Sequence, residues 1–302
     1  MSIMRTMDAR QAMQRMRSLL TALAACLALL AGPAGCAASQ VLLTPTAAAV
    51  SPAVPPAASP TATATAAGPD CPASGRVEAI QIPTTHLDAP LQANVYLPPC
   101  YDRQAGRRYP VLYLFHGQGS TDDQWLRLGA ASAADRLIDS DQVVPFLIVM
   151  PYDPSWRQPD EYGFADAVLQ DLLPAIDSRY RTLADRTHRA VGGLSRGSGW
   201  AFHFGLSRPD LFGAIGAHSV VLFDVDSQQV NAWLAALTPT DTPRIYLDIG
   251  DQDGGLASAR ILEQQLTADD IPHEWHLNLG EHDEAYWSAH VEAYLRWYAA
   301  GW

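Results

Sequence analysis

Short runs of apolar residues alternate with longer amphipathic segments from residue 77 to the end of the chain. Runs that are apolar on both faces predict strands buried between helices, whereas alternation of apolar and polar residues predicts half-exposed strands. The predicted strands cover residues 77–82, 91–97, 110–117, 145–151, 188–194, 212–219, 244–251 and 273–279. The first two show the alternating pattern, and we expect them to be antiparallel neighbours.

Amphipathic segments of helical length lie between or after these strands. The predicted helices cover residues 129–140, 160–180, 198–210, 226–237, 255–270 and 284–301. Pro174 predicts a kink or a restart in the second helix, because proline lacks the N–H group that a helix interior needs. The alternation of strands and helices predicts the α/β class, with a doubly wound, mostly parallel twisted sheet covered by helices on both faces.

Residues 1–36 predict a signal peptide. Four arginines precede an apolar run at 18–32, which is shorter than the roughly 20 residues that span a membrane and ends in small residues. The segment GPAGCAAS around Cys36 is similar to the acylated cysteine motif of bacterial lipoproteins, and LAAC ending at Cys26 is the alternative. We therefore expect an exported bacterial protein, either anchored by lipid at the cell surface or secreted.

Residues 37–70 are rich in proline, alanine, threonine and serine and carry no charged side chain before Asp70. Such a segment cannot bury enough apolar area to offset the entropy of ordering it, which predicts a disordered linker. The remaining residues, 71–302, suffice for one α/β catalytic domain with a substantial core, and no second domain is required.

The cysteines and the net charge indicate a disulfide and disfavour metal and nucleic-acid binding. Cys71 and Cys100 flank the first two predicted strands, and in an exported chain they predict one disulfide, with two unpaired buried thiols as the alternative. Two isolated cysteines without a histidine cluster do not predict a metal site. The net charge is −12, from 20 basic and 32 acidic residues, which disfavours nucleic acid as a partner.

The segment AVGGLSRGSGW, residues 190–200, contains the pattern Gly-x-Ser-x-Gly at Gly193, Ser195 and Gly197. The pattern lies between a predicted strand and a predicted helix, the context in which a nucleophilic serine occupies a tight turn above a sheet. The helix that follows directs free N–H groups toward the place where negative charge develops. Ser195 is therefore predicted to be a nucleophile rather than an idle serine in a glycine-rich loop.

A serine nucleophile needs a base and a carboxylate, which follow it along the chain in the order acid, then histidine. His282 lies in the loop between the last predicted strand and the last helix, and it is the predicted base. Asp253 is the predicted acid and Asp251 the alternative. Asp248 lies within a predicted strand and is expected to be structural.

The tetrahedral intermediate needs two backbone donors. The predicted donors are the N–H groups of Gln118 and Arg196, with Gly119 as the alternative to Gln118. Six residues are candidates for lining the substrate site; for the tryptophans core packing is the default expectation and stacking on a substrate the alternative. These residues are His116, Gly117, Gly119, Trp125, His218 and Trp287.

Several segments carry a resemblance to a known family. They are VYLPPCYD, RRYPVLYLFHGQG, VGGLSRGSGWAF, RPDLFGAIGAHS and GEHDEAYW, spread from about residue 77 to residue 302. Together they resemble the esterase D and enterochelin-esterase-like family of α/β-hydrolases. The resemblance implies an α/β-hydrolase fold without a large lid, Ser195 as nucleophile, His282 as base and an acid in GDQDGG. The family's Gly-x-x-Asp spacing corresponds to Gly250 and Asp253.

The sequence therefore predicts an exported serine carboxylesterase that hydrolyses carboxylic esters through an acyl-enzyme. The expected substrate is a small-molecule or carbohydrate-linked ester, and no metal or cofactor is required. One alternative is a mycolyltransferase-like acyltransferase, in which an alcohol replaces water. Another is a non-catalytic surface binding protein on the same fold. The sequence leaves the acyl and alcohol groups and the oligomeric state open.

Overall fold

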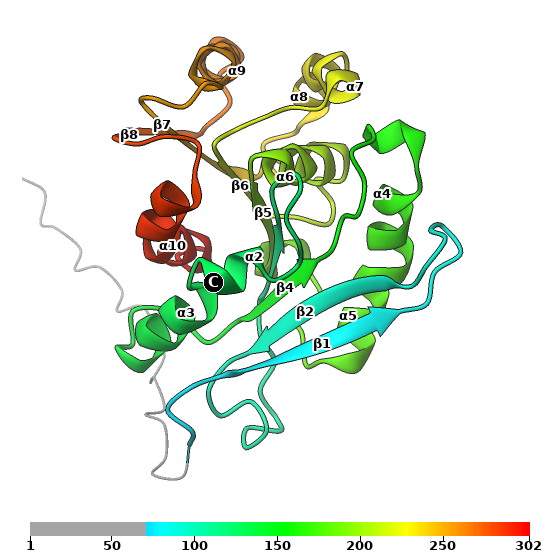
Figure 1. Cartoon of the computed structure of the whole chain (residues 1–302), viewed down its shortest axis with the longest axis vertical. Coiled ribbons are helices and arrows are strands. Elements are labelled where there is room, and N and C mark those ends of the chain that lie inside the picture. Colours follow the sequence, from blue (N-terminus) through cyan, green and yellow to red (C-terminus); the bar gives the residue numbers. More distant parts are fainter. Residues whose placement is uncertain (1–70) are drawn as a thin grey trace, which may run out of the picture. The chain divides into compact units, whose positions relative to one another are not determined.

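An eight-stranded, mostly parallel sheet runs through residues 71–302, the part of the chain that this computed structural model describes (Figure 1). The predicted signal peptide and linker, residues 1–36 and 37–70, lie outside the described residues. The strands are β1 (Arg76–Ile82), β2 (Leu91–Leu97), β3 (Val111–Phe115), β4 (Leu147–Pro151), β5 (Arg189–Leu194), β6 (Ala214–His218), β7 (Arg244–Gly250) and β8 (Glu274–Asn278). Each corresponds to a predicted strand, with ends that differ by no more than two residues.

The order of the strands in the sheet is β1-β2-β4-β3-β5-β6-β7-β8. Strand β2 runs antiparallel to both β1 and β4, and the strands from β4 to β8 are parallel. The predicted antiparallel pairing of the first two strands is confirmed. The carboxyl ends of β3, β5, β6 and β7 meet at one edge of the sheet, which is where α/β folds place their ligands.

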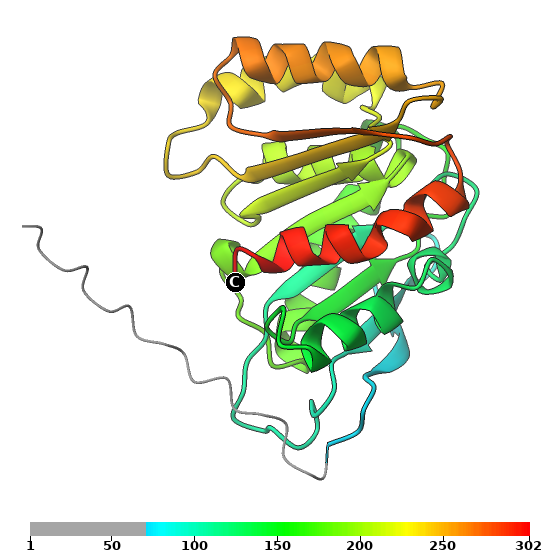
Figure 2. The same cartoon turned by 90° about the vertical axis from the view of Figure 1, so that its left-hand side faces the viewer.

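Helices cover both faces of this sheet. Those in the described residues are α2 (Gln124–Arg127), α3 (Ala130–Asp139), α4 (Phe164–Asp166), α5 (Leu173–Arg179), α6 (Arg196–Ser207), α7 (Asp224–Ser227), α8 (Val230–Ala236), α9 (Leu256–Ala268) and α10 (Glu284–Ala299). Figure 2 shows α3 and α10 lying across one face of the sheet. No helix among residues 71–302 is both long and apolar enough to span a bilayer.

Two hydrophobic clusters, one on each side of the sheet, form the core. Along β3, Val111, Tyr113 and Phe115 pack in the cluster with α6, while Leu112 and Leu114 pack in the cluster with α3 and α10. Alternate residues of a strand point to opposite faces, so a strand buried on both faces must be apolar throughout. This is the physical reason why the continuous apolar runs predicted the strands correctly.

Two predicted helices differ from a single regular α-helix. Within residues 160–180, the backbone is helical from Phe164 to Arg179 as α4, a π-helical segment (Ala167–Leu172) and α5, and Pro174 is near the start of α5. The helix does not restart at Pro174, and the irregularity takes the form of wider helical turns before the proline. The single helix predicted at 226–237 is wrong, because α7 and α8 are separate short helices.

The predicted disulfide is present. Cys71 lies before β1 and Cys100 follows β2, and the two cysteines are bonded. The bond holds the start of the described chain against the end of the antiparallel pair.

Candidate active site

Ser195 occupies a strained turn between β5 and α6. Its backbone angles are φ 52° and ψ −124°, outside the ordinary regions for a residue with a β-carbon. A β-carbon on Gly193 would overlap the backbone of Gly197, and one on Gly197 would overlap the carbonyl of Phe115. The N–H of Ser195 donates to the carbonyl of His218 at 2.8 Å. The two glycines of the motif are therefore needed for the turn.

A hydrogen-bonded line joins three side chains at this edge of the sheet. His282 Nε2 lies 2.9 Å from Ser195 Oγ, and His282 Nδ1 lies 2.7 Å from Asp253 Oδ2. The buried Asp253 carboxylate can only accept, so His282 donates through Nδ1–H, and its Nε2 is left to accept the serine proton. This is the tautomer that a general base for Ser195 needs.

The turn after β7 decides which aspartate faces the histidine. The second carboxylate oxygen of Asp253 accepts the N–H of Gly255 at 2.8 Å, which holds the side chain inside the turn. Asp251, the predicted alternative, is exposed and accepts the N–H of Gly280 at 3.0 Å. The structure therefore places Asp253, and not Asp251, against His282.

Asp248 belongs to a separate buried network below the site. Its carboxylate accepts from His218 Nδ1 and from the hydroxyls of Tyr286 and Tyr294, each at 2.6 Å. His218 Nε2 lies 3.1 Å from the hydroxyl of Tyr298. His218 is fully buried, so its predicted place in the substrate site is wrong. The expectation that Asp248 is structural agrees with these contacts.

Trp125 and Trp287, the two tryptophans named as candidates for the substrate site, lie in the core. Trp125 donates to the carbonyl of Phe115 at 2.9 Å and is buried. Trp287 donates to Ser219 Oγ at 3.0 Å, and its ring meets the ring of His282 edge-on with centroids 5.1 Å apart. Trp287 is buried as well, so it supports the imidazole from within the protein instead of facing substrate. Each indole N–H group has a hydrogen-bond acceptor inside the protein, so both side chains can be buried without leaving a polar group unpaired.

The loop after β3 presents backbone donors close to the serine. The N–H of Gly117 is occupied by Gln124 Oε1 at 2.8 Å, and a β-carbon on Gly117 would lie 3.5 Å from that of Ser195. Within residues 71–302, no protein acceptor takes the N–H of Gln118 or of Arg196. Both are therefore available to an oxyanion, although Gly119, exposed with φ +76°, keeps an unpaired N–H too.

His116 orients this loop from below. Its Nε2 accepts the N–H of Asp153 at 2.9 Å, so its Nδ1–H donates to the carbonyl of Gly117 at 2.7 Å. Burial lowers the pKa of His116, which favours this neutral form. The carbonyl of Gly117 points toward His116, and the N–H of Gln118 in the same peptide plane therefore points the opposite way. His116 is buried and does not line the surface, which corrects its predicted role.

Asp153 is a buried residue that no sequence motif singles out. One carboxylate oxygen accepts from Arg196 Nε at 2.9 Å and from Trp200 Nε1 at 2.7 Å. The other accepts from the N–H of Ser155 at 3.0 Å and from the hydroxyl of Tyr162. The ion pair fixes the side chain of the residue that follows Ser195. The only signal in the sequence is an aspartate two residues beyond the apolar run of β4.

We expect Asp153→Asn to lower the free energy of unfolding by about 3 kcal/mol, because it leaves the Arg196 guanidinium buried without a counter-charge. Chemical denaturation monitored by tryptophan fluorescence measures the change. The matched control is Asp210→Asn, which breaks the exposed pair with Arg208 and should cost less than about 1 kcal/mol. Equal losses in the two variants would contradict a structural role for the buried pair.

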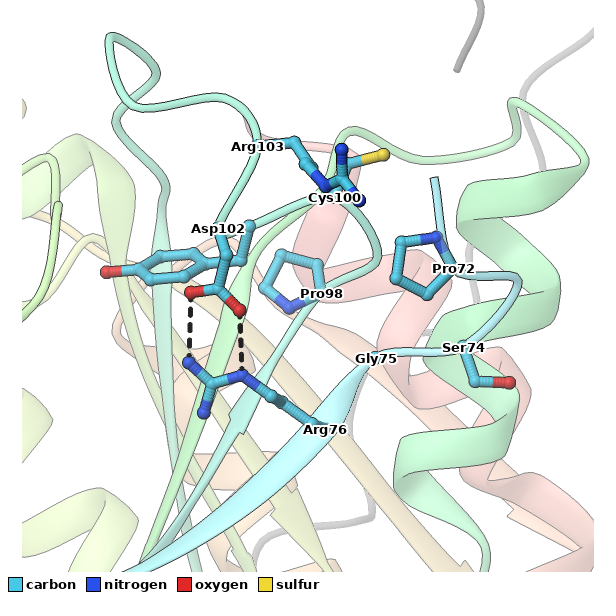
Figure 3. Close-up of a pocket in the computed structure, with 9 residues that line it drawn as sticks. Pro72, Ser74, Gly75, Arg76, Pro98, Cys100, Asp102 and Arg103 are labelled. Atoms are coloured by element: carbon cyan, nitrogen blue, oxygen red, sulfur yellow. Dashed lines mark hydrogen bonds and ion pairs between the residues drawn. The ribbon is translucent and has the colours of Figure 1, made fainter. Parts of the chain in front are cut away.

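A separate pocket of about 310 Å³ lies beside the disulfide (Figure 3). Its lining includes Pro72, Pro98 and Arg76, whose guanidinium makes two hydrogen bonds of 3.1 Å to Asp102. Arg76 pairs with Leu97 at the end of β2, whereas Ala93 near the start of β2 pairs with Pro151 at the carboxyl end of β4. Ser195 lies at the carboxyl ends of the parallel strands, so the pocket lies at the other end of the strands. No cluster of residues suited to a metal ion occurs in the part of the chain that the structure describes.

The chain is similar in sequence to known esterases. Residues 84–299 match a family model described as "Putative esterase". The chain is 36% identical over 134 residues to an endo-1,4-beta-xylanase/feruloyl esterase of Xylanibacter ruminicola, and 34% identical over 134 residues to Esterase Rv1288 of Mycobacterium tuberculosis. These matches cover 40% and 42% of this chain but only 18% and 28% of the two relatives.

Solved structures share the fold at low sequence identity. A ferulic acid esterase superposes with a TM-score of 0.68 at 22% identity, covering 76% of this chain and 99% of that chain. A ferulic acid esterase of Anaeromyces mucronatus, in complex with ferulic acid, has a TM-score of 0.59 at 19% identity, covering 74% and 89% of the two chains. The described residues therefore have the α/β-hydrolase fold of these enzymes.

Proposed function

The chain belongs to the esterase family, and on this premise we propose that it is a serine carboxylesterase with Ser195, His282 and Asp253 as its catalytic triad. The observation that carries the proposal is the hydrogen-bonded line from Ser195 Oγ through the imidazole to the buried carboxylate. A fold alone does not establish catalysis, but a nucleophile, an oriented base and free donors in one place support it.

The proposed reaction proceeds in two halves. Ser195 Oγ attacks the ester carbonyl carbon while its proton passes to His282 Nε2, and the carbonyl oxygen becomes an oxyanion held by the N–H groups of Gln118 and Arg196. The C–O bond to the alcohol then breaks, and the leaving oxygen takes the proton from His282. Water, deprotonated by His282, attacks the acyl-enzyme and releases the acid and Ser195.

The surroundings of Trp156 support an ester with a flat ring. The Trp156 side chain lies in the loop after β4, is 71% exposed, and comes within 3.7 Å of a β-carbon built on Gly119. Buried partners anchor the loop on both sides, because Asp153 accepts from the N–H of Ser155 and Arg196 donates to the carbonyl of Arg157 at 2.7 Å. An exposed indole on an anchored stretch of backbone beside the oxyanion loop suits an aromatic acyl group such as feruloyl.

Trp156→Ala should raise KM for methyl ferulate by about tenfold, because one aromatic contact is worth on the order of 1 kcal/mol or slightly more. Trp156→Phe keeps a ring and should raise KM by less. Ethyl acetate, whose acyl group has no ring, is the control substrate and should react equally with all three proteins. A uniform effect on both esters, or none on methyl ferulate, would show that Trp156 does not contact the acyl group.

Hydrolysis and acyl transfer share the same acyl-enzyme and differ only in the acceptor. We propose water as the acceptor, in keeping with the names of the esterases that this chain resembles. Product analysis of methyl ferulate turnover with and without an added sugar separates the two reactions, because a feruloylated sugar forms only by transfer. A protein that binds esters without turning them over would correspond to the binding-protein alternative.

We also propose that the enzyme is exported. The arginine-rich start, the apolar run at 18–32 and the disulfide between Cys71 and Cys100 support an oxidising compartment. Metabolic labelling with a radioactive fatty acid, in wild type and in Cys36→Ser and Cys26→Ser variants, distinguishes a lipid-anchored from a secreted form.

A further inference from the structure

A polar network links the loop that carries the oxyanion donors to the helix that follows the catalytic histidine. Glu284 is the first residue of α10, two positions after His282. Its carboxylate accepts from Gln124 Nε2 at 3.2 Å and from Arg127 Nη1 at 2.7 and 3.0 Å. Gln124 and Arg127 both belong to α2, which follows the oxyanion loop.

Both donors also reach the loop itself. Gln124 Oε1 accepts the N–H of Gly117 at 2.8 Å, and Arg127 Nη2 donates to Ser120 Oγ at 3.0 Å. Gly117 and Ser120 lie on either side of Gln118 and Gly119, which supply the predicted oxyanion donor. Glu284 is therefore connected to both ends of the loop through one intermediate side chain on each path.

The chemistry of Glu284 determines how the Gln124 amide is oriented. A carboxylate accepts hydrogen bonds and cannot donate them, so the amide must turn its nitrogen to Glu284 and its oxygen to Gly117. In that orientation Gln124 occupies the N–H of Gly117 and leaves the N–H of Gln118 free for substrate. A reversed amide would place two N–H donors against each other at Gly117 and would displace the loop.

We propose that Glu284 is a positioning residue for the oxyanion hole, which keeps the donor loop in register with the turn that carries His282. The inference rests on the proposed function, because it concerns the hydrolytic step at Ser195. Glu284 does not touch the reacting atoms in this arrangement. Its contribution comes from the direction in which the N–H of Gln118 points when negative charge develops on the substrate.

The variant Glu284→Ala should lower kcat for p-nitrophenyl acetate by about tenfold and leave KM within about twofold, because a misdirected oxyanion donor weakens the transition state more than the bound substrate. Glu284→Gln retains an acceptor for Gln124 but loses the charge that holds Arg127, so its loss should be smaller. The matched control is Glu292→Ala, which breaks a 3.2 Å pair to Arg136 between α10 and α3, away from the loop.

Binding of a trifluoromethyl ketone distinguishes positioning from a general loss of structure. The ketone adds to the serine and places an oxyanion in the hole, so its affinity should fall in Glu284→Ala by the same factor as kcat/KM. Combining Glu284→Ala with Gln124→Leu should cost less than the product of the two single losses, because both changes interrupt the path through Gln124. Thermal midpoints of all variants are measured alongside.

The outcomes separate the two proposals. Wild type that hydrolyses esters, together with Glu284→Ala as active as Glu292→Ala, would overturn the role of Glu284 and leave the proposed function intact. A loss of kcat with unchanged ketone affinity would also overturn it, since the hole would then be intact. Wild type that neither turns over esters nor binds the ketone would overturn the proposed function, and this inference with it.

Discussion

Replacing Ser195 with alanine is expected to lower kcat for p-nitrophenyl acetate by at least roughly 10⁴-fold while the protein stays folded. Without Oγ no acyl-enzyme forms, and only general binding and the oxyanion donors remain to assist attack by water. The side chain is small and half-buried, and alanine adds no atom to the strained turn. Steady-state kinetics and circular dichroism measure the two parts of the expectation.

The serine experiment has a control on the same helix. Ser207 lies at the far end of α6, and Ser207→Ala should retain the activity of wild type. A fluorophosphonate should label Ser195 alone in wild type and in Ser207→Ala, and it should label nothing in Ser195→Ala, as mass spectrometry of the digested protein would show. Unchanged turnover in Ser195→Ala, or a label on another serine, would refute the assignment of the nucleophile.

The second large effect is expected at the carboxylate. Asp253→Asn should lower kcat by about 10⁴-fold, because an amide can present its NH₂ group to His282 and stabilise the tautomer with the proton on Nε2. That tautomer cannot accept the proton of Ser195. The imidazolium formed during attack would also lose the carboxylate that lies 2.7 Å from Nδ1. Kinetics with p-nitrophenyl acetate at neutral pH provide the measurement.

Asp251→Asn is the matched comparison, since it makes the same chemical change two residues earlier in the chain. Asp251 is exposed and bonds to the N–H of Gly280, so its loss should change kcat by less than about threefold. A larger loss in Asp251→Asn than in Asp253→Asn would show that the working enzyme uses the other carboxylate.

Most of the sheet could be predicted because its physical requirement is local. A strand such as β3, buried on both faces, needs apolar residues at every position, and that need is visible in five consecutive residues. The ends of the helices were harder to predict. The segment 226–237 has a helical pattern, yet its chain forms α7 and α8, since the pattern of apolar positions does not show where the backbone bends between them.

The fate of the aromatic residues and histidines could not be predicted in the same way. Trp125 and Trp156 both follow the ends of neighbouring strands, but the first is buried and the second is largely exposed. Both ring nitrogens of His116 and of His218 have partners inside the protein, among them the backbone N–H of Asp153, from the loop after β4, and the carboxylate of Asp248, from β7. Which partner a side chain finds depends on elements that are distant in sequence.

The sequence by itself determined the α/β class, the strand positions and the turn around Ser195, because each depends on residues close together or on a repeating pattern along the chain. Only the tertiary structure decided that Asp253 rather than Asp251 faces His282, that Asp153 pairs with Arg196, and that Glu284 reaches Gln124. The first contact arises because β7 and β8 are neighbours in the sheet, the second from the spatial order β4-β3-β5, and the third from α10 packing beside α2 and α3. Hydrogen bonds act over about 3 Å, so they depend on which loops the sheet brings together rather than on distance along the chain.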